Sequence, residues 1–244
     1  MKGLQKTDKQ QETDTMKYKN VEEGIFIKRP NRFIAHVEIN GKEEVCHVKN
    51  TGRCRELLVA GAPVFLEKSD NPNRKTQYDL IAVKKGDRMI NMDSQIPNRV
   101  VEEWLLAGNL FGKDAKVKRE VTYGNSRFDL YIESQEKKIF MEVKGVTLEK
   151  NGAVYFPDAP TKRGVKHVKE LCQCIRDGYE AYIMFVIQME DVKYFAPNDE
   201  THPEFGQALR EAQAAGVKIL AYSCNVRKDL INLLKPVRVY LDGR

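Results

Sequence analysis

Two acidic residues and a lysine interrupt an otherwise apolar alternation in the segment SRFDLYIESQEKKIFMEVKG, residues 126–145. Apolar and polar residues alternate on both sides of the polar dipeptide Gln135-Glu136, which predicts a β-hairpin with its turn at that dipeptide. Centring the turn there makes one face apolar throughout, and this agreement fixes the register. The facing apolar pairs are Phe128 with Val143, Leu130 with Met141, and Ile132 with Ile139.

The other face of this hairpin carries charges that a purely structural hairpin does not need. Asp129 is expected opposite Glu142, and Arg127 opposite Lys144. Facing Cβ atoms lie about 4.5–5.5 Å apart, where like charges are destabilising. A divalent cation would compensate, because Mg²⁺ is bound by one or two carboxylates together with water and substrate phosphates. The alternative interpretation is a solvent-exposed face on which Arg127 and Lys144 relieve the repulsion.

Asp129, Glu142 and Lys144 are the residue types that metal-dependent phosphodiester hydrolysis requires. Asp129 and Glu142 would hold Mg²⁺ or Mn²⁺, which lowers the pKa of a water molecule and withdraws charge from the phosphoryl group. Lys144 would orient the water or stabilise the developing charge.

Residues 20–94 are expected to form a separate β domain. Five candidate strands are punctuated by Gly, Asn and Pro: RFIAHVEI, EEVCHVK, APVFLEKS, YDLIAVKK and RMINMDS. Five short strands predict a small barrel similar to the oligonucleotide-binding (OB) fold, whose surface binds single strands. Any other small β domain is the alternative.

The connection between the second and third of these strands contains the segment GRCRELLVAG, which predicts a short helix. Four residues in or beside it are candidate nucleic-acid contacts: Lys49, Asn50, Arg53 and Arg55. The alternative is a structural turn, because Asn and Gly are typical turn residues.

Residues 95–244 follow a different pattern, in which helices and strands alternate. The segment RVVEEWLLAGNLF has helical spacing, KVKREVTYG predicts a strand before the hairpin, and GVTLEKNGAVYFPDAP predicts a long loop. AYIMFVIQ is apolar throughout, which is typical of a strand buried in a parallel sheet. Its last residue, Gln188, could reach the site or simply end the strand. A helix over roughly residues 203–215 and the strands VKILAYSC and VRVYL complete the domain.

The segment TKRGVKHVKELCQCIRDG predicts a helix that binds phosphate. Thr161 is its expected N-cap and Gly178 its stop. The positive N-terminal end of a helix attracts anions. The polar side of this helix carries Lys162, Arg163, Lys166 and His167. Arg127 of the hairpin is a further candidate nucleic-acid contact. The alternative is a solvated basic surface.

The order helix, three strands, helix, strand resembles the core of the PD-(D/E)XK nucleases, with Asp129 on the second strand and EVK on the third. In that fold a helical carboxylate often points toward the metal, so the resemblance makes Glu103, on the preceding helix, a further candidate metal ligand, with a solvated helix face as the alternative. Longer stretches resemble a narrower family over about residues 24–223. The segments YGNSRFDLYIE, MEVKGVTL, YFPDAPTKRGVKHVKEL, VKNTGRCRELL and IPNRVVEEWLLAG are similar to the sugar fermentation stimulation protein A (SfsA) family.

This resemblance implies a cytoplasmic, DNA-binding bacterial or archaeal protein. An OB-like five-stranded barrel (20–94) would precede a restriction-endonuclease-like α/β domain with a mixed sheet (95–244). The chain departs from the family in a longer polar amino-terminal tail and in Cys54, where a hydrophobic residue is usual. We therefore expect a DNA-binding protein with a Mg²⁺-dependent nuclease site. The alternative is a non-catalytic DNA-binding regulator of sugar metabolism on a nuclease scaffold.

The composition agrees with a soluble cytoplasmic protein that binds an anionic partner, and the resemblance implies that this partner is DNA rather than RNA. The net charge is +6, which permits nucleic acid as that partner. No segment reaches the roughly 18 apolar residues of a membrane span. Residues 1–19 lack the apolar core of a signal peptide and are expected to be a disordered polar tail. The five cysteines form no C-x-x-C pair, which argues against a disulfide framework and a zinc site.

Overall fold

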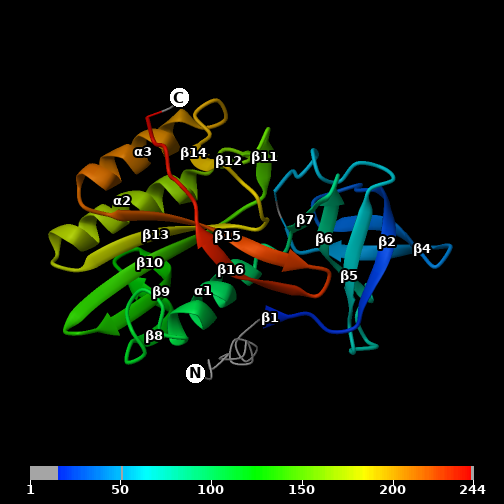
Figure 1. The fold of residues 1–244 in the computed structure, drawn as a ribbon, viewed down its shortest axis with the longest axis horizontal. Helices are drawn as coiled ribbons and strands as arrows, with labels where there is room; N and C mark the ends of the chain where they lie inside the picture. Colours follow the sequence, from blue (N-terminus) through cyan, green and yellow to red (C-terminus); the bar gives the residue numbers. More distant parts are fainter. Residues whose placement is uncertain (1–15, 51, 243–244) are drawn as a thin grey trace, which may run out of the picture.

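The structure, a computed structural model, describes residues 16–50 and 52–242, which form a β-barrel followed by an α/β domain (Figure 1). The barrel strands are β2 (Val21–Lys28), β3 (Ile34–Ile39), β4 (Lys42–Val48), β5 (Pro63–Lys68) and β6 (Tyr78–Lys85). They pair in the order β4-β3-β2-β5-β6, and a parallel pairing of β4 with β6 closes the ring. The expected OB-like five-stranded barrel is confirmed.

One strand of this barrel was not expected from the sequence. β2 replaces the segment RMINMDS in the ring, and that segment forms β7 (Arg88–Asn91), which pairs only with β6. The Gly24 in β2 weakens its strand pattern. The structure explains this glycine, because a Cβ at Gly24 would lie 2.6 Å from Cγ1 of Val37 on β3.

The predicted short helix in GRCRELLVAG is wrong. Residues 55–57 form a turn, in which the amides of Leu57 and Leu58 both donate to the carbonyl of Cys54. Cys54 has a φ of +46°, a conformation that cannot continue a right-handed helix. Cys54, Leu57 and Leu58 are nevertheless buried, so the segment closes one side of the barrel core.

The second domain is built on a seven-stranded mixed sheet, as expected. Its strands run in the order β1 (Met16–Lys17), β16 (Leu230–Pro236), β15 (Lys218–Arg227), β13 (Glu180–Ile187), β10 (Lys137–Val146), β9 (Ser126–Ser134) and β8 (Lys116–Tyr123). The central strands β10, β13 and β15 are parallel, and the outer pairings are antiparallel. β13 is buried from Ala181 to Ile187, as its apolar run predicts.

Helices cover both faces of this sheet (Figure 1). α1 (Ile96–Leu106) packs on one face, and α2 (Lys162–Arg176) and α3 (Pro203–Ala214) pack on the other. Thr161 is the N-cap of α2, and its side chain accepts a hydrogen bond from the Gly164 amide at 3.0 Å, as predicted. None of the helices in the described part of the chain is long and apolar enough to cross a membrane.

Three other expectations for this domain are corrected. The stretch expected as a loop forms a hairpin of β11 (Leu148–Lys150) and β12 (Ala153–Phe156), which joins β14 (Tyr194–Pro197) in a three-stranded sheet. The sheet is extended by β16, whereas VRVYL contributes a single bridge between Val239 and Phe195. α1 begins at Ile96 and not at Arg99, because Pro97 is well suited to the first helical turn.

The amino-terminal tail is shorter than the expected 1–19. Residues 1–15 lie outside the described residues. Met16 pairs with Ile231 of β16, and the side chain of Tyr18 is buried. The hydroxyl of Tyr18 accepts a hydrogen bond from the Asn91 side chain at 3.0 Å. Residues 16–18 therefore belong to the folded domain, since two apolar side chains in this polar segment find buried positions.

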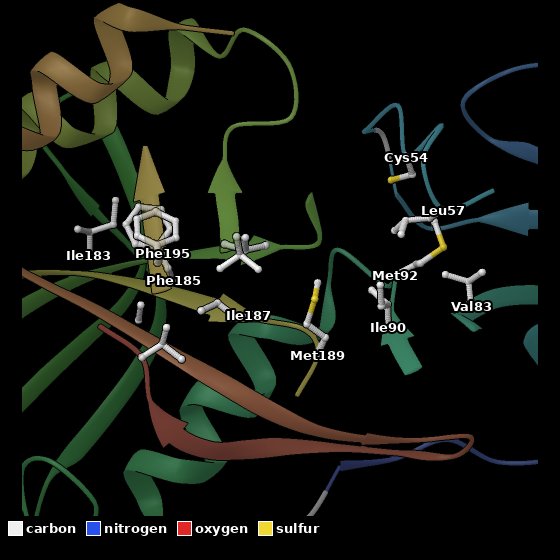
Figure 2. Close-up of a cluster of buried hydrophobic side chains, with 14 of the residues drawn as sticks. Cys54, Leu57, Val83, Ile90, Met92, Ile183, Phe185, Ile187, Met189 and Phe195 are labelled. Atoms are coloured by element: carbon white, nitrogen blue, oxygen red, sulfur yellow. The ribbon is translucent and has the colours of Figure 1, made fainter. Parts of the chain in front are cut away.

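A buried hydrophobic cluster extends across the two domains. Figure 2 shows Ile187 and Met189, at the end of β13, between Phe185 of the α/β domain and Met92 of the barrel, and these side chains belong to one buried cluster. Gln188, between Ile187 and Met189, donates through Nε2 to Oδ1 of Asn91 at 2.9 Å and to the carbonyl of Asp93 at 3.0 Å. Gln188 therefore links the domains.

Candidate metal and nucleic-acid site

The antiparallel ladder between β9 and β10 has the predicted register but stops where the charges begin. It runs from the pair Lys137 and Ser134 to the pair Met141 and Leu130. Two residues beyond Met141, the amide of Val143 donates instead to Oδ2 of Asp129 at 2.8 Å. The strand pairing is thus replaced by a side chain, and the carboxylate of Asp129 is fixed at the open end of the hairpin.

Phe128 does not lie on the predicted face of the hairpin. Leu130, Ile132 and Met141 are buried beneath α1, as expected, but Phe128 belongs to the cluster beneath α2. Its ring packs edge-on against His167, with 6.1 Å between the ring centroids. β9 stays paired with β8 at this point, but Glu120, between the pairs Arg119–Leu130 and Val121–Phe128, has a φ of +54°, and the regular alternation is interrupted there.

Glu142 lies on the α2 side of the sheet and is only 2% exposed. Its Oε1 atom accepts hydrogen bonds from Nζ of Lys144 and from Nδ1 of His167, the latter at 2.5 Å. Its Oε2 atom is also buried and has no hydrogen-bond partner among the described residues. The solvent-exposed interpretation of this face is therefore wrong for Glu142, and one buried carboxylate oxygen remains unsatisfied.

The pKa values of the two carboxyl groups are shifted in opposite directions. Burial raises the pKa of Asp129, and the charge of Glu142 raises it further. Burial also acts to raise the pKa of Glu142, but the hydrogen bond from His167 and the charge of Lys144 outweigh it, so this pKa is lowered. A pair of carboxyl groups whose pKa values are driven apart is characteristic of functional sites. The raised pKa of Asp129 indicates that ionising this carboxyl group beside Glu142 costs free energy while no cation is bound.

The donor set at these carboxylates fits a hard divalent cation. Mg²⁺ and Mn²⁺ prefer oxygen ligands, and Mg²⁺ needs few protein ligands because it retains water. The buried, unsatisfied Oε2 atom of Glu142 and the nearby carboxylate of Asp129 could supply two such ligands. No group of three or more His, Cys, Asp or Glu side chains that could hold a metal occurs in residues 16–50 and 52–242.

Glu103, the third predicted metal ligand, is engaged elsewhere. Its carboxylate accepts a hydrogen bond from Nε of Arg99 at 2.8 Å. The side chain of α1 that reaches the site is Asn98, whose Nδ2 donates to Oδ1 of Asp129 at 2.8 Å. Glu103 lies five residues further along, which corresponds to about 7.5 Å along the helix axis. No sequence pattern indicated Asn98, because an amide near a helix start is usually interpreted as a cap.

The predicted phosphate-binding residues of α2 come together in one cleft. Its volume is about 390 Å³, and its lining contains Arg127, Lys162, Arg163, Lys166 and His167, together with Asn125 and Ser126. Four of the five predicted residues are exposed cations, and His167 is buried. Among the described residues, Arg127 has one carboxylate within salt-bridge reach, Glu120 at 3.5 Å, and Lys166 lies 3.8 Å from Glu170 on its own helix.

His167 connects this cleft to the carboxylates. Its Nε2 atom accepts a hydrogen bond from Nε of Arg163 at 3.3 Å, and its Nδ1 atom donates to Glu142. In this arrangement Nδ1 is the donor and Nε2 the acceptor of the ring. His167 is therefore neither a solvated residue nor a free phosphate ligand: it positions Glu142 from the floor of the cleft.

Ser126 is a functional candidate that the sequence did not indicate. Its side chain lines the cleft and is 6% exposed, and its Oγ atom has no hydrogen-bond partner among the described residues. A hydroxyl in this position can donate to a bound phosphate oxygen. Single serines carry no sequence signal of this kind, because serine is common at the start of strands and in turns.

The four predicted contacts on the barrel separate into two pairs. Lys49 is enclosed by three carboxylates, with Nζ 3.1 Å from Asp79 and 3.7 Å from both Glu67 and Asp93. Burial acts to lower the pKa of Lys49, but these charges raise it. Lys49 is thus a structural ion-pair residue and not a nucleic-acid contact.

Asn50 likewise has a structural role. Its Nδ2 donates to the carbonyl of Met92 at 2.9 Å, and its Oδ1 accepts from the Gly52 amide at 2.7 Å, which is the turn alternative. Arg53 and Arg55 are exposed. The amide of Arg53 donates to Oδ2 of Asp158 at 3.1 Å. Asp158 lies in the segment that leads into α2, so this contact places Arg53 near the N-terminal end of α2.

The chain is similar to two known domain families, and to related proteins, over nearly all of its described length. Residues 27–92 match the family described as SfsA N-terminal OB domain, and residues 95–230 match the Sugar fermentation stimulation protein RE domain. The sugar fermentation stimulation protein homologues of Ruminiclostridium cellulolyticum and Clostridium beijerinckii are each 62% identical over 226 residues, which is 93% of this chain and 100% of each relative. The solved structure of Pyrococcus furiosus SfsA in complex with Ca²⁺ is 29% identical, with a TM-score of 0.82, and the match covers 92% of this chain and 98% of that one.

Proposed function

The chain belongs to the sugar fermentation stimulation protein (SfsA) family, and we propose that it is a DNA-binding protein with a Mg²⁺- or Mn²⁺-dependent nuclease site. The observation that carries this proposal is the carboxylate of Glu142, with one oxygen held by Lys144 and His167 and the other buried without a partner among the described residues. A buried, unsatisfied carboxylate oxygen is costly, and a cation shared with Asp129 would remove that cost.

A relative supports a divalent cation in this family. The Pyrococcus furiosus SfsA structure was solved in complex with Ca²⁺. Ca²⁺ and Mg²⁺ are both hard cations that take oxygen ligands, although they differ in size and in coordination number. We take this as support for an oxygen-ligated cation at Asp129 and Glu142, whose side chains are the acidic groups at the open end of the β9–β10 hairpin.

Each of these residues would have a distinct role in phosphodiester cleavage. Asp129 and Glu142 would hold the cation, which supplies Lewis acidity toward a phosphate oxygen. Asn98 and the Val143 amide fix the orientation of Asp129, and His167 fixes that of Glu142. Such support restricts the ligands of a metal to one geometry.

Lys144 and the α2 cleft would handle the substrate. The side chain of Lys144 is 18% exposed, so its ammonium would meet the reacting phosphate while it remains bound to Glu142. There it would stabilise negative charge that develops in the transition state. Arg163, Lys162 and Lys166 face the cleft at the N-terminal end of α2, where free amides and the helix dipole add to the attraction for phosphate.

The test is incubation of the purified protein with single-stranded and double-stranded DNA and RNA in the presence of Mg²⁺, Mn²⁺ or a chelator. We expect cleavage of DNA that requires metal and is lost in Asp129→Asn. A matched control is Asp114→Asn, which removes an exposed carboxylate outside the site. If none of the substrates is cut with either metal, the protein is a non-catalytic DNA-binding regulator on a nuclease scaffold.

A further inference from the structure

The barrel carries a second basic groove, distinct from the α2 cleft. It has a volume of about 620 Å³ and lies between the end of β2 with the following loop and the turn after β4. Five cations contribute to its lining, and none of the lining residues is acidic. These cations are Lys28, Arg29, Arg32, Arg53 and Arg55. None of the five has a carboxylate within salt-bridge distance in the described part of the chain, so the groove presents uncompensated positive charge.

Arg29 gives this groove a fixed shape. Its Nη1 atom donates to the carbonyls of Gly52 and Arg53, each at 2.9 Å, and its Nη2 atom donates to the carbonyls of Arg32 and Asn50 at 2.7 Å and 2.6 Å. A single guanidinium therefore ties both walls of the groove together. The neighbouring cations Lys28, Arg32, Arg53 and Arg55 are exposed, so they project from a preorganised backbone.

An exposed aromatic ring stands beside these cations. The side chain of Phe33 is 49% exposed, and the guanidinium of Arg32 lies over it, 5.5 Å from the ring centroid. Phe33 is the only aromatic side chain among the exposed large hydrophobic residues of the described chain. An exposed ring bordered by cations is the surface on which unpaired bases stack while the cations contact the backbone.

The groove also lies next to the α2 cleft. The Arg53 amide contacts Asp158, and Lys162, the first residue of α2, follows Asp158 by four residues. Four residues span at most about 14 Å, so one strand of nucleic acid could contact both surfaces. We propose that the groove bordered by Phe33 binds a single-stranded segment of the nucleic-acid substrate and leads it toward the α2 cleft. A duplex has no unpaired base for Phe33.

This inference rests on the proposed function but is tested without it. Fluorescence anisotropy in a chelator measures binding of a labelled single-stranded DNA of about 12 nucleotides, within the site size of one OB fold, and of the matched duplex. We expect tighter binding of the single strand. Phe33→Ala should weaken it by about 5- to 150-fold, the equivalent of one base stack, leave the duplex unchanged, and be rescued by Phe33→Tyr.

Two further variants isolate the contributions of apolar surface and charge. Leu234→Ala removes a side chain that is 48% exposed on β16, and it should bind like the wild type. Arg53→Ala with Arg55→Ala should reduce the log–log salt slope by about 0.7 for each phosphate that these arginines neutralise. Lys138→Ala with Lys228→Ala, which removes two exposed lysines elsewhere, should leave the slope unchanged.

The outcomes separate this inference from the nuclease proposal. Equal single-strand affinity of the wild type and Phe33→Ala, or an equal loss for the duplex, would overturn the groove assignment, even where metal-dependent cleavage is found. Phe33-dependent binding in chelator supports the groove assignment, even where no substrate is cut. A third probe is an RNA strand of the same sequence. Stacking on Phe33 is predicted for RNA as for DNA, so a difference between the two affinities would show that the groove also contacts the sugar.

Discussion

The backbone amide of Val143 donates to Oδ2 of Asp129 at 2.8 Å, immediately beyond the last pair of the β9–β10 ladder. In a plain hairpin this amide would bond to the facing strand or to water. Here it orients a carboxylate whose pKa is raised by burial and by Glu142. The hairpin therefore ends in a carboxylate, that of Asp129, whose charge costs stability while no cation is bound.

Asp129→Asn is expected to leave the metal-free protein as stable as the wild type at pH 7, or to stabilise it. A carboxyl group with a raised pKa favours the folded state below its ordinary pKa of 3.8, and this contribution is lost as the pH rises through the raised pKa. The ionised group thus costs stability at pH 7. Urea unfolding in chelator measures it, with Asp114→Asn as control. A loss above about 1 kcal/mol would show that Asp129 stabilises the fold.

Glu142→Gln is expected to change the stability in the opposite direction and to destabilise the folded protein at pH 7. The lowered pKa of Glu142 means that its charge stabilises the folded protein above the ordinary pKa of 4.5 and that this contribution is lost as the pH falls through the lowered value. The substitution leaves Lys144 without its anion, so we expect a loss of about 1–3 kcal/mol at pH 7. The loss should shrink in acid. Glu136→Gln, at the exposed turn, is the control, and a pH-independent difference would contradict the ion-pair interpretation.

Lys144→Ala is expected to abolish most cleavage while metal binding is retained. An ammonium is not a metal ligand, but a cation aimed at developing negative charge contributes a factor of about 100 or more to the rate. Single-turnover cleavage and a Mn²⁺ titration on the same preparation measure the two effects. Lys138→Ala, at the hairpin turn, is the matched control. Equal losses of cleavage and of metal affinity would assign Lys144 to holding the carboxylates alone.

Thr161→Ala should cost about 1 kcal/mol of stability, because the Thr161 side chain caps α2 through the Gly164 amide. Thr161→Ser keeps the hydroxyl and should restore most of the loss. Thermal unfolding of the three proteins provides the comparison. A Thr161→Ala protein as stable as the wild type would mean that the first turn of α2 is held by its packing rather than by the cap.

Local periodicity was sufficient to predict some elements of the fold. The hairpin register and the buried strand β13 follow from apolar patterns that only one pairing satisfies. Strand β2 was missed because its closest packing is at Gly24, where the absence of a side chain is what matters. Phe128 was placed on the wrong face because the alternation is interrupted between Leu130 and Phe128, beside Glu120 with its φ of +54°, and no residue pattern in the hairpin indicates this interruption.

The site residues could be predicted from the sequence where a charged residue interrupts an apolar pattern. They could not be predicted where no such interruption occurs. Asp129, Glu142 and Lys144 stand out for that reason, and the structure brings them together. Lys49 was assigned to nucleic acid because its partners Asp79 and Asp93 are distant in sequence. Asn98 could not be identified from the sequence, since its role depends on where α1 meets β9.

A cation site formed by Asp129 and Glu142 underlies the proposed function. Isothermal titration of Mn²⁺ into the wild type and into Asp129→Asn tests it most directly, because this variant is expected to remain folded. We predict saturable binding to the wild type and binding at least about tenfold weaker, equivalent to about 1.4 kcal/mol, in the variant. Matching isotherms, whether both proteins bind Mn²⁺ or neither does, would contradict the existence of this site.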